Sequence, residues 1–192
     1  MKEPLLHIPQ ESFRVMLQSV HDAIFSGQEC RSEVFEERFS PFLDKSWEKV
    51  LIAQGILRLK DEDFKALAHA TSKVGDTHVI VTSAEMGHEV TVKVAWDREA
   101  LEKARWDGTQ FDLFEIHAFG MSGAWGLMCY YDEFSMLGGT SSFMTAFLDA
   151  AGGRERVKSR FIQHALEIWD MDPVQQVQVL KSVGWSFSDA SA

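Results

Sequence analysis

The residues best suited to chemistry are a serine, an aspartate and a histidine that follow one another as Ser122, Asp149 and His164. Ser122 lies in Gly120-Met121-Ser122-Gly123-Ala124, one residue short of the Gly-x-Ser-x-Gly elbow that exposes a serine hydroxyl between a strand and a helix. The order serine, acid, histidine suits the same class of hydrolase. A plain turn between two strands is the favoured interpretation, because residues 125–131 have the pattern of a strand. A small serine hydrolase that uses Ser122 is the alternative.

A second pair of reactive side chains, Glu115 and His117, is spaced two residues apart on a predicted strand and therefore shares one face of it. A carboxylate beside an imidazole can tune acid–base chemistry or bind a metal. We expect instead a polar pair that is exposed or partly buried on the open face of the sheet. Two further histidines, His78 and His88, flank a predicted hairpin out of register, so no metal site is expected.

A glycine corner, Gly138-Gly139-Thr140, precedes a predicted helix and could present backbone N–H groups to an anion. It lacks the lysine and the remaining glycines of a phosphate-binding loop. We therefore interpret it as a tight corner and expect no cofactor.

The charge layout is the most informative feature for function. Residues 106–153, called here the acidic span, contain six Asp or Glu residues and no Lys or Arg. One way to balance this charge is for the basic run that follows, residues 154–160, to fold back over Asp132 and Glu133. The other is an exposed surface of carboxylates and aromatic rings that captures a basic protein through steering and a few buried anchors. The residues expected in that surface are Trp125, Tyr130, Tyr131, Asp132, Glu133 and Phe134.

Composition sets outer bounds on the function. A chain of 192 residues with 45% hydrophobic residues fits one soluble domain. Two distant cysteines and no visible signal peptide favour a reducing, cytoplasmic compartment. No apolar run is long enough to span a membrane. A net charge of −10 disfavours nucleic-acid binding, because the phosphate backbone would repel it.

The N-terminal part of the chain has helical periodicity, in which apolar residues recur three and four positions apart. We expect these segments to form a helical layer over residues 1–75, with Asp61 capping its last helix. Two successive helices there could also suggest DNA binding, but the second one is mainly acidic at its start. The expected helices span residues 10–26, 33–39, 44–54 and 61–73.

The remainder changes to strand periodicity and then back to helix. Residues 77–83 and 89–95 predict a hairpin, and residues 98–105 a short helix. Further strands are expected at 111–119, 125–131 and 136–137, with Asp132-Glu133 as a turn. Helices follow at 140–150, 154–169 and from Pro173 to Gly184.

The predicted architecture is α+β: an N-terminal helical run, a central antiparallel sheet of four to five strands, and C-terminal helices packed on one face. A single domain divides into a helical layer (1–75), a sheet region (76–139), C-terminal helices (140–185) and a loose tail (186–192). The leading functional hypothesis is a non-catalytic cytosolic protein-binding domain, such as an immunity or antitoxin-type protein that neutralises a basic bacterial toxin. A structural or regulatory subunit of an oligomer is a further alternative.

Overall fold

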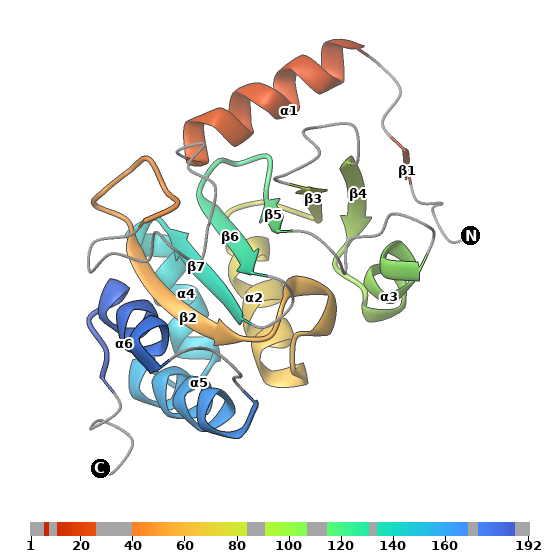
Figure 1. The fold of residues 1–192 in the computed structure, drawn as a ribbon. Coiled ribbons are helices and arrows are strands. Elements are labelled where there is room, and N and C mark those ends of the chain that lie inside the picture. The colour runs from red at the N-terminus through yellow and green to blue at the C-terminus, as the bar shows by residue number, and fades with distance from the viewer. Residues whose placement is uncertain are drawn as a thin grey trace.

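The computed structural model describes residues 6–7, 11–25, 40–83, 91–106, 115–130, 134–168 and 173–186. These residues form one antiparallel sheet of seven strands in the order β1-β4-β3-β5-β6-β7-β2, with helices on both faces (Figure 1). The α+β class is confirmed, although the sheet has more strands than the four to five expected. The strands are β1 (Leu6–His7), β2 (Glu48–Ala53), β3 (His78–Ser83), β4 (Thr91–Ala95), β5 (Ile116–Phe119), β6 (Trp125–Tyr130) and β7 (Phe134–Gly139).

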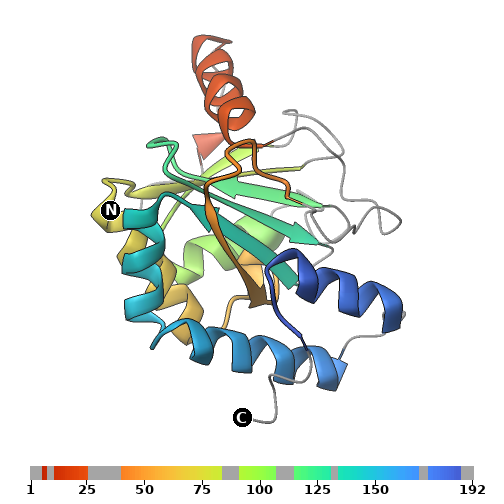
Figure 2. The same ribbon diagram turned by 90° about the vertical axis from the view of Figure 1, so that its left-hand side faces the viewer.

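The helices are divided unequally between the two faces of the sheet. Figure 2 shows one helix, α1, on one side of the sheet and the C-terminal helices on the other side together with α2. The packing of the C-terminal helices on one face is therefore confirmed. The helices are α1 (Glu11–Ile24), α2 (Asp61–Lys73), α3 (Arg98–Trp106), α4 (Ser141–Ala150), α5 (Arg154–Ile168) and α6 (Pro173–Ser182), with a 3₁₀ turn at Ile56–Arg58.

The predicted hairpin is confirmed, and its cause is visible in the register. β3 and β4 pair antiparallel with Val79 opposite Val94 and Val81 opposite Val92. These β-branched side chains are all buried, so strict alternation of valine in β4 places one face of the hairpin in the core.

The prediction of a helix over residues 44–54 is wrong, because β2 occupies Glu48–Ala53 and pairs with β7 along its whole length. The run from Val50 to Ala53 is buried throughout. A short apolar run without alternation does not distinguish a buried helix from a buried strand. Here the pairing with β7 and the packing of α5 against β2 decide in favour of a strand. The N-terminal region consequently contributes two strands as well as helices.

Helix boundaries agree closely with expectation after residue 60. The predicted cap, Asp61, is instead the first residue of α2, and Lys60 occupies the N-cap position. Thr140 is the N-cap of α4, without a side-chain capping bond. The short helix expected at residues 33–39, the turn at 132–133 and most of the tail lie outside the described residues. No described helix combines the length and apolar character needed to cross a bilayer.

Two glycines of the sheet allow α1 and the segment around Phe42 to pack closely against it. A Cβ atom on Gly126 of β6 would lie 2.6 Å from Ile24 Cγ2, and one on Gly138 of β7 would lie 2.4 Å from Phe42 Cε2. Ile24 and Phe42 are both fully buried. The missing side chains therefore let α1 and the segment around Phe42 pack directly on the backbone of the sheet.

Candidate functional site

The turn between β5 and β6 is organised around a buried carboxylate, Asp76, which lies between α2 and β3. Its side chain accepts hydrogen bonds from the Ser122 backbone N–H at 3.0 Å, from the Ser122 hydroxyl at 2.6 Å and from Trp125 Nε1 at 2.9 Å. Gly120 makes room for it, since a Cβ there would lie 1.9 Å from Asp76 Oδ2. Gly123 completes the turn with a φ of 66°, in the left-handed region that glycine favours.

The environment of Ser122 differs from that of a nucleophile elbow in two respects. The chain passes through Ser122 from strand β5 to strand β6 rather than to a helix, as expected for a plain turn. The Ser122 hydroxyl donates to Asp76 and accepts from the Ala124 N–H. No hydrogen bond joins Ser122 to either of the other proposed triad members among the described residues. Asp149 is exposed at the end of α4, and His164 is buried in α5.

A second polar cluster lies between α1 and the sheet and includes the pair Glu115 and His117. His21 Nε2 of α1 lies 2.9 Å from His117 Nδ1 of β5. Carboxylates flank both rings: Asp22 Oδ1 is 3.1 Å from His21 Nδ1, and Glu115 Oε1 is 3.6 Å from His117 Nε2. Phe25 stacks on the His117 ring with a centroid separation of 4.1 Å and 2° between the planes. We call Asp22, His21, His117 and Glu115 the histidine array.

The burial of this array corrects the expectation of a polar pair on an open sheet face. Glu115 is 3% exposed and His117 is 5% exposed, because α1 covers this part of the sheet. The two-residue spacing correctly placed Glu115 and His117 together, but His21 was missed. The sequence contains a pattern that indicates the inward position of His21. This residue lies four positions after Leu17 and three before Ile24, within the apolar stripe of α1.

Burial sets the protonation behaviour of His21. It lowers the pKa of His21 below the ordinary histidine value, and the nearby His117 lowers it further, while the hydrogen bond with Asp22 acts in the opposite direction. The contacts of His21 with His117 and with Asp22 are within hydrogen-bonding distance, whereas the 3.6 Å between Glu115 Oε1 and His117 Nε2 is an ion-pair distance. Among the described residues, no group of three or more His, Cys, Asp or Glu side chains could hold a metal ion.

Three of the aromatic residues expected in an exposed binding surface belong to the core. Trp125 and Phe134 are 0% exposed and Tyr130 is 8% exposed. Trp125 stacks on Phe143 of α4 with a separation of 5.6 Å between the ring centroids. The ring centroids of Tyr130 and Phe134 are 5.4 Å apart. These rings therefore support the sheet from within. The other expected members, Tyr131, Asp132 and Glu133, lie outside the described residues.

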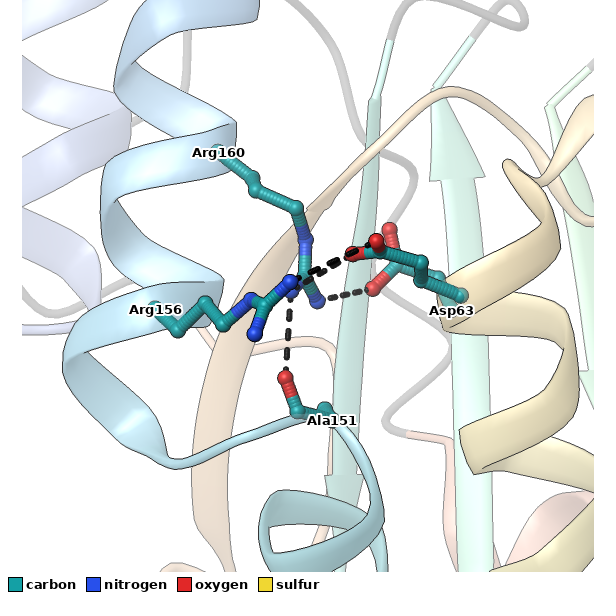
Figure 3. A network of polar contacts seen from close by, with 5 residues as sticks. Asp63, Ala151, Arg156 and Arg160 are labelled. Carbon is teal, nitrogen blue, oxygen red and sulfur yellow. Dashed lines mark hydrogen bonds and ion pairs between the residues drawn. The ribbon is translucent and has the colours of Figure 1, made fainter.

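The arginines of α5 pair with carboxylates from the N-terminal half of the chain. Arg154 pairs with Glu48 of β2. Arg160 lies 2.5 Å from Asp63 and 3.2 Å from Glu62, both on α2. Arg156 adds a longer contact with Glu62 at 3.5 Å. Arg160 also donates to the carbonyl oxygen of Ala151, as Figure 3 shows. This ion-pair network joins α5 to α2 and to the edge of the sheet.

Asp63 is the most deeply buried carboxylate of that network, with 3% of its side chain exposed. Burial raises the pKa of Asp63, and the adjacent Arg160 guanidinium opposes that rise. Removing Arg160 alone would leave a carboxylate in a poorly solvated position.

The described residues thus hold two buried polar clusters, one centred on Asp76 and one on His21 and His117, together with the ion-pair network of α5. The first fixes a turn, the second fastens a helix to the sheet, and the third joins two helices. This chain matches no protein-family model, no curated protein and no solved structure in the comparisons made.

Proposed function

We propose that this chain is a cytosolic protein-binding domain without catalytic activity and that its partner is a basic protein. In its most specific form, it acts as an immunity or antitoxin-type protein that neutralises a basic toxin. The observation that carries the proposal is the pairing of Arg154 and Arg160 with Glu48, Glu62 and Asp63.

These ion pairs matter because they engage the nearest basic residues with carboxylates outside the acidic span. Arg154, Arg156 and Arg160 are the arginines that directly follow that span in sequence. Each has its acidic partner on β2 or α2. Among the described residues, the three arginines thus have acidic partners that lie outside the acidic span.

A surface of this kind binds by charge more than by aromatic anchors. The burial of Trp125, Tyr130 and Phe134 leaves Tyr131, Asp132 and Glu133 as the proposed contact residues. Asp149, exposed on α4, adds a carboxylate of the same span. Carboxylates on a protein surface accelerate association with a basic protein, and salt screens that effect.

The first experiment is capture of partners from a lysate of the source organism by the tagged chain, at low and at high salt, followed by mass spectrometry. We expect enrichment of a basic protein that decreases at high salt. A chain that retains no protein at either salt concentration would count against the proposal.

The second experiment measures association kinetics with the purified partner by stopped flow. Asp132→Lys and Glu133→Lys should each slow association and flatten its dependence on salt. Glu102→Lys is the matched control, because Glu102 is exposed on α3, outside the acidic span, and this substitution changes the net charge equally. Equal slowing in all three variants would indicate a general charge effect and remove the acidic span from the proposal.

A subunit of a homo-oligomer is a second candidate function. It is favoured by two apolar side chains on α1, Val15 and Met16, which are 63% and 43% exposed. Light scattering at several protein concentrations tests it. A mass equal to one chain at every concentration would remove this candidate.

A further inference from the structure

Two lysines gather at the start of β2. Lys45 lies in the segment that leads into this strand, drawn in orange in Figure 1, and Lys49 is the second residue of the strand. Lys49 is partly buried. Two positive charges held close together repel each other, and the repulsion grows where water is excluded.

The register of the sheet fixes the face from which Lys49 projects. Lys49 is opposite Gly138 of β7, and residues directly opposite each other in an antiparallel pair point to the same face. A Cβ atom on Gly138 would lie 2.4 Å from Phe42 Cε2, so the Phe42 ring occupies this face. Lys49 therefore leaves the sheet on the side of Phe42.

Lys45 reaches the same place from the preceding segment. Its Nζ donates a hydrogen bond of 3.4 Å to the carbonyl oxygen of Phe42. Trp47, between the two lysines in sequence, packs on Phe42 with 5.5 Å between the ring centroids. Lys45, Trp47 and Lys49 thus gather around one buried phenylalanine on one face of the sheet.

The acidic residues nearest to these lysines in sequence are engaged elsewhere. Glu48 adjoins Lys49 in β2, so it projects from the opposite face, where it pairs with Arg154 of α5. Asp44 accepts hydrogen bonds from the backbone N–H and the hydroxyl of Ser46, at 2.8 Å and 2.7 Å. In the part of the chain that the structure describes, neither lysine forms an ion pair with a carboxylate.

The electrostatics of Lys49 agree with this geometry. Burial lowers the pKa of Lys49, and the positive charge of Lys45 lowers it further. Both causes disfavour the charged ammonium group. An anion between the two lysines would offset the repulsion and replace part of the lost hydration.

We propose that Lys45 and Lys49 bind a phosphate group, either the free ion or one carried by a small organic ligand. The phosphate dianion matches the two positive charges, and ammonium groups bind phosphate as point charges. Trp47 borders the site with an indole ring on which the organic part of a phosphate ester can pack. This site is separate from the acidic span and does not depend on the proposed basic partner.

Acetylation of the intact chain with a limiting amount of reagent, measured at each lysine by mass spectrometry, tests the site. Inorganic phosphate is titrated at pH 8, where it is mainly doubly charged, and sodium chloride keeps the ionic strength constant. Bound phosphate should protect Lys45 and Lys49, and the protection should saturate. Lys65 and Lys73, which are exposed on α2, are the internal reference and should keep their reactivity.

Substitutions separate a shared site from two independent lysines. Lys49→Gln removes one of the two cations, so the phosphate concentration that half-protects Lys45 should rise about tenfold or more. Lys45→Gln should have the same effect on Lys49, and it remains usable if Lys49→Gln does not fold. Lys65→Gln changes the net charge equally and should leave the protection of both lysines unaltered.

Phenyl phosphate in place of inorganic phosphate distinguishes the two sources of the group. Protection at a lower concentration of the ester indicates an organic ligand that uses Trp47, and protection at an equal or higher concentration indicates the free ion. Acetate at the same ionic strength should protect far less. The proposal is overturned if phosphate fails to protect Lys45 and Lys49, if Lys65 and Lys73 are protected equally, if acetate protects as well as phosphate, or if the folded Gln variants keep the original protection.

Discussion

Asp76 accepts hydrogen bonds from both the backbone N–H and the side-chain hydroxyl of Ser122, at 3.0 Å and 2.6 Å. This double contact joins the segment after α2 to the turn between β5 and β6. Trp125 adds a third donor from β6. One buried carboxylate therefore fixes the position of two elements that are distant in sequence.

Replacing Asp76 with Asn should destabilise the fold by about 1–3 kcal/mol. The amide has a single acceptor oxygen, and its NH₂ group would face either the Trp125 indole or the Ser122 N–H, both of which are donors. Urea unfolding of the variant measures the free energy of unfolding. Asp149→Asn, on the exposed end of α4, is the control and should change it by less than about 0.5 kcal/mol. Equal stability of both variants would show that the Asp76 contacts contribute nothing.

Two glycines of the same turn should respond differently to alanine. Gly120→Ala places a Cβ 1.9 Å from Asp76 Oδ2 and 2.6 Å from Trp125 Nε1, so it should cost about 3 kcal/mol through overpacking of a buried network. Gly123→Ala meets no atom within 4 Å and should cost only about 1 kcal/mol, because its φ of 66° is left-handed. Thermal unfolding of the two variants should place the lower midpoint at Gly120→Ala, and the reverse order would contradict this geometry.

The pair of Arg160 and Asp63 should show strong coupling in a double-mutant cycle. Arg160→Met alone should cost about 3 kcal/mol near neutral pH, since Asp63 keeps its charge in a buried position. The double variant Asp63→Leu with Arg160→Met should cost less than the single change, because no unpaired charge remains. Purely additive effects of the two substitutions would argue against the contact.

The same pair predicts a pH dependence. Burial already raises the pKa of Asp63, and loss of Arg160 should raise it further. As pH falls toward the carboxyl range, Asp63 takes up a proton and the penalty of Arg160→Met shrinks. Urea unfolding at pH 7 and at pH 4.5 should therefore give a larger difference from the unaltered chain at pH 7. If Arg160→Met lowers the free energy of unfolding equally at both pH values, the charge of Asp63 is not the cause of the destabilisation.

The serine-hydrolase alternative makes a direct chemical prediction. Ser122 donates its proton to a carboxylate, whereas serine hydrolases activate the nucleophile with a histidine base. We expect no labelling of the chain by a fluorophosphonate probe. Labelling that disappears in Ser122→Ala would instead establish the alternative. An unrelated purified serine hydrolase serves as the positive control for the probe.

Local sequence patterns determined much of the secondary structure. The helices at Asp61–Lys73 and Arg154–Ile168 and the hairpin of β3 and β4 agree with the periodicity of their apolar residues. These elements are specified locally because one face of each is apolar at a helical or strand repeat. The two-residue spacing of Glu115 and His117 also placed them together.

Only the tertiary structure determined that β2 is a strand and which polar side chains contact one another. Residues 50–53 are apolar without a repeat, so pairing with β7 and cover from α5 were needed to make them a strand. Asp76 meets Ser122, His21 meets His117, and Arg160 meets Asp63 across long stretches of sequence. A sequence gives the charge and hydrogen-bonding capacity of each side chain. Which donor meets which acceptor depends on how the chain brings distant segments together, because these interactions act over only a few ångströms.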